Sequence, residues 1–253
     1  MSKVIVITGA SSGIGAVLAK QLAARGDVLM LAARNAETLR QVARSCGRDT
    51  YYHVTDVTHR QDVNRLRDEA LRTFENVDVW INNAGRGITR QVLDLTDEDV
   101  DEMMAVNVKS ALYGMQAIMP HFKERGQGHL INVSSFLSRV PFATQRSVYS
   151  AAKAALNILT ANLRMDLSAE YPGIHVSLVM PGVVSTEFAA NARHGAPQVG
   201  TPPNSQTPEE VAAVMIDLIY HPQAEVYTNP AAQVERVRRY YEDVAAFEDG
   251  LRR

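Results

Sequence analysis

Short apolar runs alternate with longer stretches of helical spacing along almost the whole chain. Seven runs indicate strands, at residues 4–7, 28–32, 51–54, 77–81, 129–133, 175–180 and 225–228. Six stretches indicate helices, at about 14–24, 35–44, 60–74, 96–123, 148–169 and 231–249. Strands that alternate with helices pair in parallel through right-handed crossovers. We therefore expect an α/β fold: a doubly wound (Rossmann-type), mostly parallel seven-stranded sheet with helices on both faces.

Length and composition indicate one globular domain over residues 1–253. Of the 253 residues, 46% are hydrophobic and 21% are charged, which excludes a disordered chain. The 26 basic and 28 acidic side chains give a net charge of −2, so we expect no nucleic-acid partner. Cys46 is the only cysteine, which excludes a disulfide framework and fits a reducing compartment.

The sequence predicts neither a membrane partner nor a metal site. Its apolar runs are far shorter than the about 18 residues of a spanning helix, and residues 4–7 are too few for a signal peptide. The seven histidines lack the paired spacing of metal ligands. We expect a cytoplasmic protein without a bound metal ion.

Small, polar or charged residues follow six consecutive strands. They are the segment 8–15, Arg34, Asp56, the segment 82–85, the pair Ser134 and Ser135, and the pair Pro181 and Gly182. Parallel strands bring these positions to one edge of the sheet, where ligands of open α/β sheets bind. This layout predicts an extended ligand that lies across a reversal of the strand order.

The sequence TGASSGIG at residues 8–15 connects a strand to a helix. Its glycines allow close backbone approach to a pyrophosphate, whose charge the helix N-terminus favours. Residues 9–13 also match the G-x-S-x-G nucleophile elbow of a hydrolase. That interpretation does not require Gly15 or the Asn83 loop, and it leaves Tyr149 and Lys153 without a role. We favour a dinucleotide over a hydrolase site or a plain tight turn.

Tyr149 and Lys153 stand four residues apart at the start of a predicted helix, so they share one face. A free phenol has a pKa of about 10. A neighbouring ammonium favours the phenolate and lowers that pKa, which would make Tyr149 an acid or base near neutrality. The alternative is an ordinary solvated pair on a helix surface.

Together these motifs resemble the short-chain dehydrogenase/reductase family. The matching segments stand in the family's order between Lys3 and about Tyr227. They are TGASSGIG at 8–15, NNAG at 82–85, Asn107, Ser135, YSAAK at 149–153 and PGVVST at 181–186. The resemblance implies a doubly wound sheet, a nicotinamide dinucleotide, and hydride transfer between the nicotinamide and a substrate carbon.

The resemblance also implies four catalytic residues. Tyr149 would donate a proton to a carbonyl oxygen or remove one from an alcohol. Lys153 would lower the pKa of the phenol and hold the nicotinamide ribose. Ser135 would hydrogen-bond the reacting oxygen, and Asn107 would anchor a water in a proton relay behind Lys153.

Ser134 and Ser138 remain alternatives to Ser135. The spacing from Ser135 to Tyr149 is one residue longer than the commonest spacing in similar proteins. Ser138 also stands where those proteins often have a glycine. The loop after the fifth strand is therefore expected to differ in shape.

The cofactor-binding set follows from the strand ends and the resemblance. It comprises Gly9, Ser11, Ser12, Gly13, Ile14, Gly15, Arg34, Asp56, Val57, Asn83, Ala84, Gly85, Tyr149, Lys153, Pro181, Gly182, Val184 and Thr186. By resemblance, the Asp56 side chain and the Val57 backbone contact the adenine, and Thr186 contacts the nicotinamide carboxamide. An aspartate that caps the next segment is the alternative for Asp56.

The end of the second strand selects the phosphorylated cofactor. It reads Ala32-Ala33-Arg34, whereas sites for NAD have an acidic residue there that binds the ribose diol. The Arg34 guanidinium can pair bidentately with a 2′-phosphate. We expect NADP; a solvated loop arginine is the alternative.

Residues 187–208 are expected to form a substrate lid. Four of the ten prolines fall between 197 and 208, and few apolar residues there would hold the segment before ligands bind. Phe188 is expected over the substrate, with Leu137, Val140 and Phe142 opposite. Arg193 and His194 are interpreted as solvated lid residues or as a site for an anionic substrate group.

These observations predict an NADP-dependent oxidoreductase that acts on a small-molecule carbonyl/alcohol pair. The alternative is a catalytically idle NADP-binding sensor that regulates a partner. The presence of Asn107, Ser135, Tyr149 and Lys153 together favours the enzyme, because a sensor need not retain all four. By resemblance alone, we expect a homo-oligomer, a dimer or a tetramer.

Overall fold

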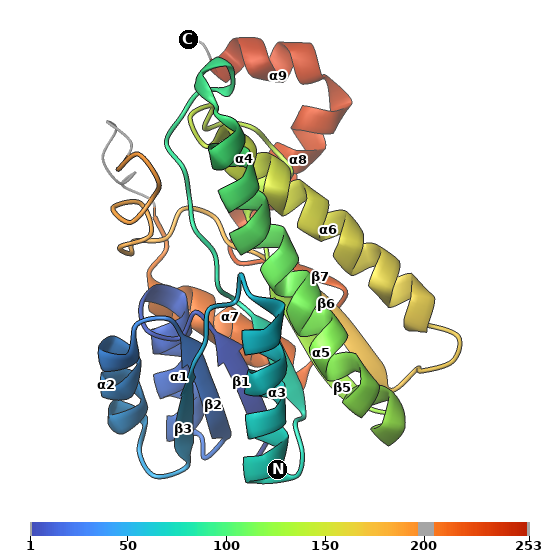
Figure 1. Cartoon of the computed structure of the whole chain (residues 1–253). Helices are drawn as coiled ribbons and strands as arrows, with labels where there is room; N and C mark the ends of the chain where they lie inside the picture. The colour runs from blue at the N-terminus through green and yellow to red at the C-terminus, as the bar shows by residue number, and fades with distance from the viewer. Residues whose placement is uncertain (1, 197–204, 252–253) are drawn as a thin grey trace.

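The strands form one parallel sheet. The computed structural model describes residues 2–196 and 205–251. Its strands are β1 (Val4–Thr8), β2 (Val28–Ala33), β3 (Thr50–Val54), β4 (Val79–Asn82), β5 (Gly128–Val133), β6 (Ile174–Met180) and β7 (Glu225–Tyr227). They lie in the order β3-β2-β1-β4-β5-β6-β7, and every neighbouring pair is parallel (Figure 1). The expected Rossmann-type fold is confirmed, with a sheet that is parallel throughout the described residues.

Helices cover both faces of the sheet. They are α1 (Gly13–Ala24), α2 (Ala36–Cys46), α3 (Arg60–Phe74), α4 (Asp97–Met104), α5 (Ser110–Arg125), α6 (Ser147–Leu167), α7 (Pro208–Tyr220), α8 (Pro230–Glu242) and α9 (Val244–Leu251). One apolar core lies between the sheet and α1, α2 and α7, and the other lies between the sheet and α3, α5 and α6. Ile5 and Val6 of β1 enter opposite cores, as a strand buried on both faces requires. No described helix combines the length and the apolar content that crossing a membrane requires.

Three helical features differ from the sequence prediction. Helix α7 was not expected, although Thr207 and Glu210 form a capping box at its start. The helix expected over 96–123 is interrupted by a π-helical segment, η2 (Ala105–Lys109), between α4 and α5. Instead of one helix over 231–249, α8 and α9 are separated at Asp243, whose backbone is extended.

The strand order reverses beside β1. The chain builds β2 and β3 on one side of β1 and then crosses to β4 on the other side. The connections that follow β1 and β4 therefore diverge, and they leave a crevice at the carboxyl ends of the strands. This edge lies at the top of the sheet in Figure 1.

A buried polar chain fixes α5 and α6 against the β4–β5 half of the sheet. The fully buried Trp80 indole donates to Asn82 Oδ1 at 2.8 Å. The Asn82 amide donates to Ala111 O at 3.2 Å and to Asn132 Oδ1 at 2.9 Å. The Asn132 amide continues to Thr160 Oγ1 of α6 at 2.9 Å. Because each buried polar group has a partner, the chain adds rigidity where α6 must hold its side chains in place.

Candidate functional site

One cleft of about 900 Å³ runs along the carboxyl edge of the sheet. Residues that follow all six strands from β1 to β6 line it. The predicted site residues among them are Gly9, Ser11, Ser12, Gly13, Ile14, Gly15, Arg34, Val57, Asn83, Ala84, Gly85, Ser135, Tyr149, Lys153, Pro181, Gly182, Val184 and Thr186. Asp56 and Asn107 lie outside this lining.

The turn after β1 depends on its glycines. Gly9 has φ +67°, and a Cβ there would lie 2.8 Å from Ala84 Cα. A Cβ on Gly15 would lie 2.4 Å from the Gly9 carbonyl oxygen. The Asn83 amide donates to the carbonyl oxygens of Thr8 and Gly9, at 2.9 and 3.2 Å, and so braces the turn. These glycines therefore let the backbone pack closely around the turn, and the turn borders the open space of the cleft.

The N-terminus of α1 faces this space without a side-chain cap. Its N-cap residue, Ser12, makes no capping hydrogen bond, and the first turn contains no acidic residue. The first backbone N–H groups of a helix have no partner within the helix, and they carry a partial positive charge. This arrangement fits a pyrophosphate, so the turn passes the test for a dinucleotide.

Arg34 and Asp56 follow β2 and β3. Arg34 is exposed at the cleft, and none of the described carboxylates lies within ion-pair distance of it. Asp56 Oδ1 accepts from Thr58 N at 3.0 Å and from Thr58 Oγ1 at 2.7 Å. The Asp56 carboxylate thus holds the turn before α3, the alternative role considered for it, and its contact with an adenine stays a prediction.

Tyr149 and Lys153 project from the first turns of α6. Burial raises the pKa of Tyr149, while a hydrogen bond with Ser135 and the charge of Arg146 lower it. Burial lowers the pKa of Lys153 to about 7, and its Nζ donates to Val133 O at 2.8 Å. Lys153 Nζ lies 5.9 Å from the centroid of the Tyr149 ring. The charge of Arg146 opposes the rise in the Tyr149 pKa, and an effect of Lys153 on that pKa stays a prediction.

Ser134 and Ser138 point their hydroxyl groups away from Tyr149. Ser134 Oγ donates to Asn157 Oδ1 at 2.6 Å, and Ser138 Oγ donates to the Ser135 carbonyl oxygen. The Ser135 hydroxyl accepts from Leu137 N at 3.2 Å and is the one that bonds to Tyr149. The geometry thus favours Ser135 over both alternatives.

Asn107 lies in the π-helical segment η2, behind Lys153. Its amide donates to Arg86 O at 3.0 Å and to Met103 O at 3.1 Å. A Cβ on Gly85 would lie 3.0 Å from Asn107 Oδ1 and 3.3 Å from Lys153 Nζ, so both side chains face the same glycine. Single-turn π segments inside helices are frequent at functional sites.

The hydrolase interpretation finds no support at the turn. A nucleophile elbow needs a histidine within hydrogen-bond reach of its serine. In the described part of the chain, no histidine lines the cleft and none bonds to Ser11 or Ser12.

Ion pairs with α4 hold the described first part of the segment after β6. Arg193 pairs with Asp99 and Glu102 of α4, and His194 Nε2 lies 2.8 Å from Asp99 Oδ1. Carboxylates of the protein itself bind both side chains, so neither is free for an anionic substrate group, while His194 is exposed as a solvated lid residue would be. The expectation that little holds the predicted lid is wrong for this start, while residues 197–204 lie outside the described residues.

The apolar side chains expected over the substrate are largely in place. The Phe188 ring lies 5.6 Å from the Tyr149 ring, between centroids. Leu137 and Phe142 line the cleft with it. Val140 does not, because it is fully buried beneath the surface.

The cleft, with its glycine turn at one end and a buried tyrosine at the other, lies on an α/β fold of the Rossmann type. A family model described as short chain dehydrogenase matches residues 3–197, and the chain belongs to this family of oxidoreductases. It is 35% identical over 237 residues to the uncharacterised oxidoreductase YxnA of Bacillus subtilis strain 168. That match covers 91% of this chain but only 66% of YxnA, just under two thirds of that relative's length.

Two solved structures share the fold. An alcohol dehydrogenase of Thermococcus sibiricus, in complex with 5-hydroxy-NADP, is 28% identical with a TM-score of 0.79, over 90% of this chain and 96% of that one. A short-chain dehydrogenase/reductase of Burkholderia phymatum, in complex with NAD, is 26% identical with a TM-score of 0.85, over 97% and 95%. Structural neighbours of this chain thus include binders of either nicotinamide cofactor.

The carboxylate of Asp99 yields a pH prediction. Burial alone would raise its pKa, but hydrogen bonds from His194, the Thr96 backbone and Arg193 lower it from 3.8 to about 2. Because the pKa is lower in the folded state, the ionised carboxylate stabilises the fold above about pH 4, and this contribution is lost as the pH falls towards 2. Asp99→Asn should therefore destabilise the protein at pH 6 and do so less at pH 3.

Urea unfolding of both proteins at the two pH values measures the difference. Asp68→Asn is the control, because the Asp68 carboxylate is exposed and makes one surface ion pair, with Arg67. An Asp99→Asn effect of equal size at both pH values would contradict the pKa argument.

Proposed function

We propose that this protein is an NADP-dependent oxidoreductase that transfers a hydride between the nicotinamide and the carbon of a carbonyl/alcohol pair. The observation that carries the proposal is the position of Tyr149. Its buried side chain bonds to Ser135 in the same cleft that contains the open glycine turn. A general acid must lie beside the reacting oxygen, and a carbonyl oxygen bound between these two hydroxyl groups meets that requirement.

The cofactor residues divide the cleft into two ends. The turn at 9–15 would bind the pyrophosphate, Arg34 the 2′-phosphate, and Asp56 with Val57 the adenine. At the other end, Lys153 and Thr186 would hold the nicotinamide half. When bound, the cofactor would supply the hydride in its reduced form, NADPH, or accept it in its oxidised form, and the protein contributes position and electrostatics.

The side chains around Tyr149 would then move one proton. In reduction, Tyr149 gives its hydroxyl proton to the carbonyl oxygen while Ser135 donates a hydrogen bond to the same oxygen. Lys153 and Asn107, which face Gly85 together, would return a proton to Tyr149 through a bound water. In oxidation of an alcohol the proton moves in the opposite direction.

Tyr149→Phe tests the role of the phenol. It removes the transferable proton and keeps the ring, so kcat should fall by about 10²- to 10⁴-fold while NADPH affinity stays nearly unchanged. The measurement is NADPH oxidation with a panel of ketones and aldehydes, together with cofactor titration by fluorescence.

Tyr241→Phe, at an exposed site in α8, is the matched control. A Tyr149→Phe enzyme that keeps more than about a tenth of wild-type kcat would exclude Tyr149 as the general acid. A wild-type protein that binds NADPH but reduces no member of the panel would favour the sensor.

Arg34→Ala tests the cofactor choice. A charge-assisted contact with the 2′-phosphate is expected to favour NADPH over NADH about 10- to 100-fold in kcat/KM, and the variant should lose this preference. Arg44→Ala, also exposed but at the end of α2, should keep it. Equal use of both cofactors by the wild type, or a preference that survives Arg34→Ala, would refute NADP selection by Arg34.

We also propose that the protein is a cytoplasmic homo-oligomer that assembles through α6. Ile158 and Met165 of this helix are 63% and 74% exposed. Sedimentation should give a dimer or a tetramer, and Ile158→Glu should shift it towards the monomer because a charge enters an apolar contact. Leu93→Glu, at an equally apolar and even more exposed site, should not. A monomeric wild type, or equal effects of both variants, would contradict assembly through α6.

A further inference from the structure

Arg146 is a buried cation without a counter-ion. Its side chain belongs to a residue that is only 8% exposed, and none of the carboxylates in residues 2–196 and 205–251 forms an ion pair with it. The other arginines of this region differ: Arg86 and Arg193 bind Glu102, and Arg90 and Arg193 bind Asp99. Burying a charge without a partner costs folding free energy. An arginine that is nevertheless buried in this way is available to bind an anionic ligand.

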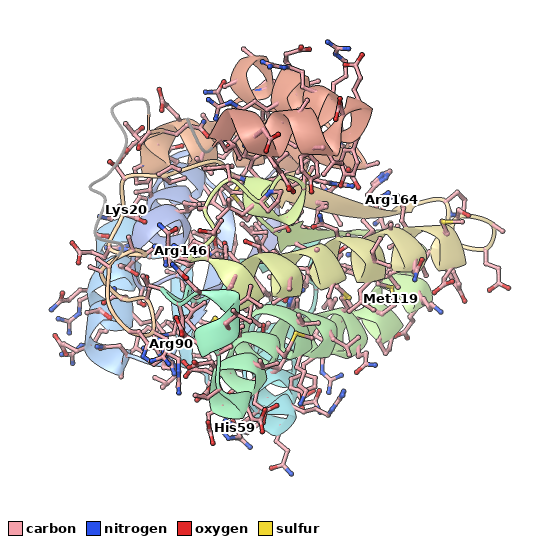
Figure 2. All side chains as sticks on the ribbon, turned by 90° about the horizontal axis from the view of Figure 1, so that it is seen from above. Lys20, His59, Arg90, Met119, Arg146 and Arg164 are labelled. Atoms are coloured by element: carbon pink, nitrogen blue, oxygen red, sulfur yellow. The ribbon has the colours of Figure 1, made fainter. Side chains whose placement is uncertain are left out.

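The guanidinium of Arg146 faces the reacting end of the cleft. Arg146 immediately precedes α6 (Figure 2). It lines the cleft together with Tyr149 and Phe188. Burial raises the pKa of Tyr149 and the charge of Arg146 opposes that rise, as expected for neighbouring groups. Nη1 donates to Ile88 O at 3.0 Å, while the described residues provide no acceptor for the remaining N–H groups. A guanidinium has five donors, so most of them remain available to a ligand.

The surroundings hold Arg146 in this position. A Cβ on Gly87 would lie 2.8 Å from Arg146 Nη1 and 2.9 Å from Phe188 Cε1, so the glycine makes room for both side chains. Arg90 N donates to Gln145 O at 2.8 Å, and Ser147 Oγ donates to Arg90 O at 2.6 Å. The loop after β4 is thus paired with the residues on either side of Arg146. A guanidinium fixed in this way loses little freedom when it binds a planar anion.

We propose that Arg146 is the anion receptor of the substrate site and that the substrates are oxo- or hydroxy-carboxylates. The planar fork of a guanidinium matches the two oxygens of a carboxylate. Phe188 and Leu137 supply apolar surface for the carbons between the carboxylate and the reacting carbonyl. This inference rests on the proposed oxidoreductase function, and it names the substrate class of that site.

The test compares acids with their esters. The probes are unbranched oxo-carboxylates with one to four carbons between carbonyl and carboxylate, each with its methyl ester, and whichever of NADPH and NADH supports turnover. For at least one chain length, wild type should prefer the acid about 10- to 100-fold in kcat/KM, mainly through KM. Arg146→Gln should abolish this preference. Arg146→Lys, which keeps the charge without the fork, should retain part of it.

Arg164→Gln is the matched control. Arg164 lies on the same helix, far from the cleft, and its guanidinium also donates to backbone carbonyls, at 2.9 Å to Val176 O and 3.0 Å to Ala224 O (Figure 2). This variant should keep the acid preference. Thermal melts identify variants that fail to fold, and if Arg146→Gln fails, Arg146→Lys decides.

Three outcomes would overturn the proposal. Wild type could prefer no acid at any chain length, Arg146→Gln could keep the preference, or it could lower turnover of acids and esters equally. The last result would make Arg146 a positioning residue for Tyr149. If wild type reduces none of these probes and no member of the ketone and aldehyde panel, the proposed function fails, and calorimetric titration of pentanoate into the protein with NADP judges Arg146 separately. Binding that Arg146→Gln abolishes supports the anion receptor, and equal or absent binding refutes it.

Discussion

The hydrogen bonds between the ends of β1 and β4 are the constraint on which the rest of the site depends. The Thr8 hydroxyl donates to Ile81 O at 3.2 Å and accepts from Asn83 N and Ala84 N at 3.0 and 3.2 Å. The Asn83 amide returns two hydrogen bonds to the turn after β1. The two strands where the sheet order reverses are thereby joined at the point where their loops diverge. The Thr8 hydroxyl and the Asn83 amide thus fix the shape of the crevice that contains the glycine turn at one end and Tyr149 at the other.

Charge is distributed unevenly around this crevice. The carboxylates near its rim, Asp99 and Glu102, are fully occupied by arginines of the loop after β4 and of the segment after β6. Inside, Arg34 lies at one end, and Lys153 and Arg146 lie at the other. In the described structure, the only carboxylate that lines the cleft, Glu187, is exposed and pairs with none of them. A cleft with cations at both ends is suited to a ligand pair with negative charge at both ends, such as a phosphorylated dinucleotide and a carboxylate substrate.

The parts predicted correctly from sequence are those in which local chemistry and fold agree. Alternating apolar runs determine the strands. Asn35, where the second helix was expected to begin, accepts from Glu37 N and Thr38 N and so caps α2. The features that the sequence did not predict depend on contacts between residues that lie far apart in the chain. Arg146 stands three positions before Tyr149, a spacing that places both on one helix face, but its lack of a counter-ion depends on Asp99 and Glu102 pairing elsewhere. The anchoring of Arg193 depends on the same two carboxylates. The capping box of Thr207 and Glu210 is, by contrast, a local sequence signal for the start of α7.

The surroundings of Tyr149 favour its protonated form. Burial raises the pKa of the phenol, and burial lowers the pKa of Lys153 to about 7, so near neutrality the site carries less charge than two isolated side chains would. A protonated phenol is the form that donates a proton to a carbonyl oxygen, and Ser135 and Arg146 reduce the cost of forming the phenolate that remains. A cationic group that enters beside Lys153 and Tyr149, as an oxidised nicotinamide would, favours the phenolate further. Under the proposed function, the same pair of residues would therefore act as an acid with the reduced cofactor and as a base with the oxidised one.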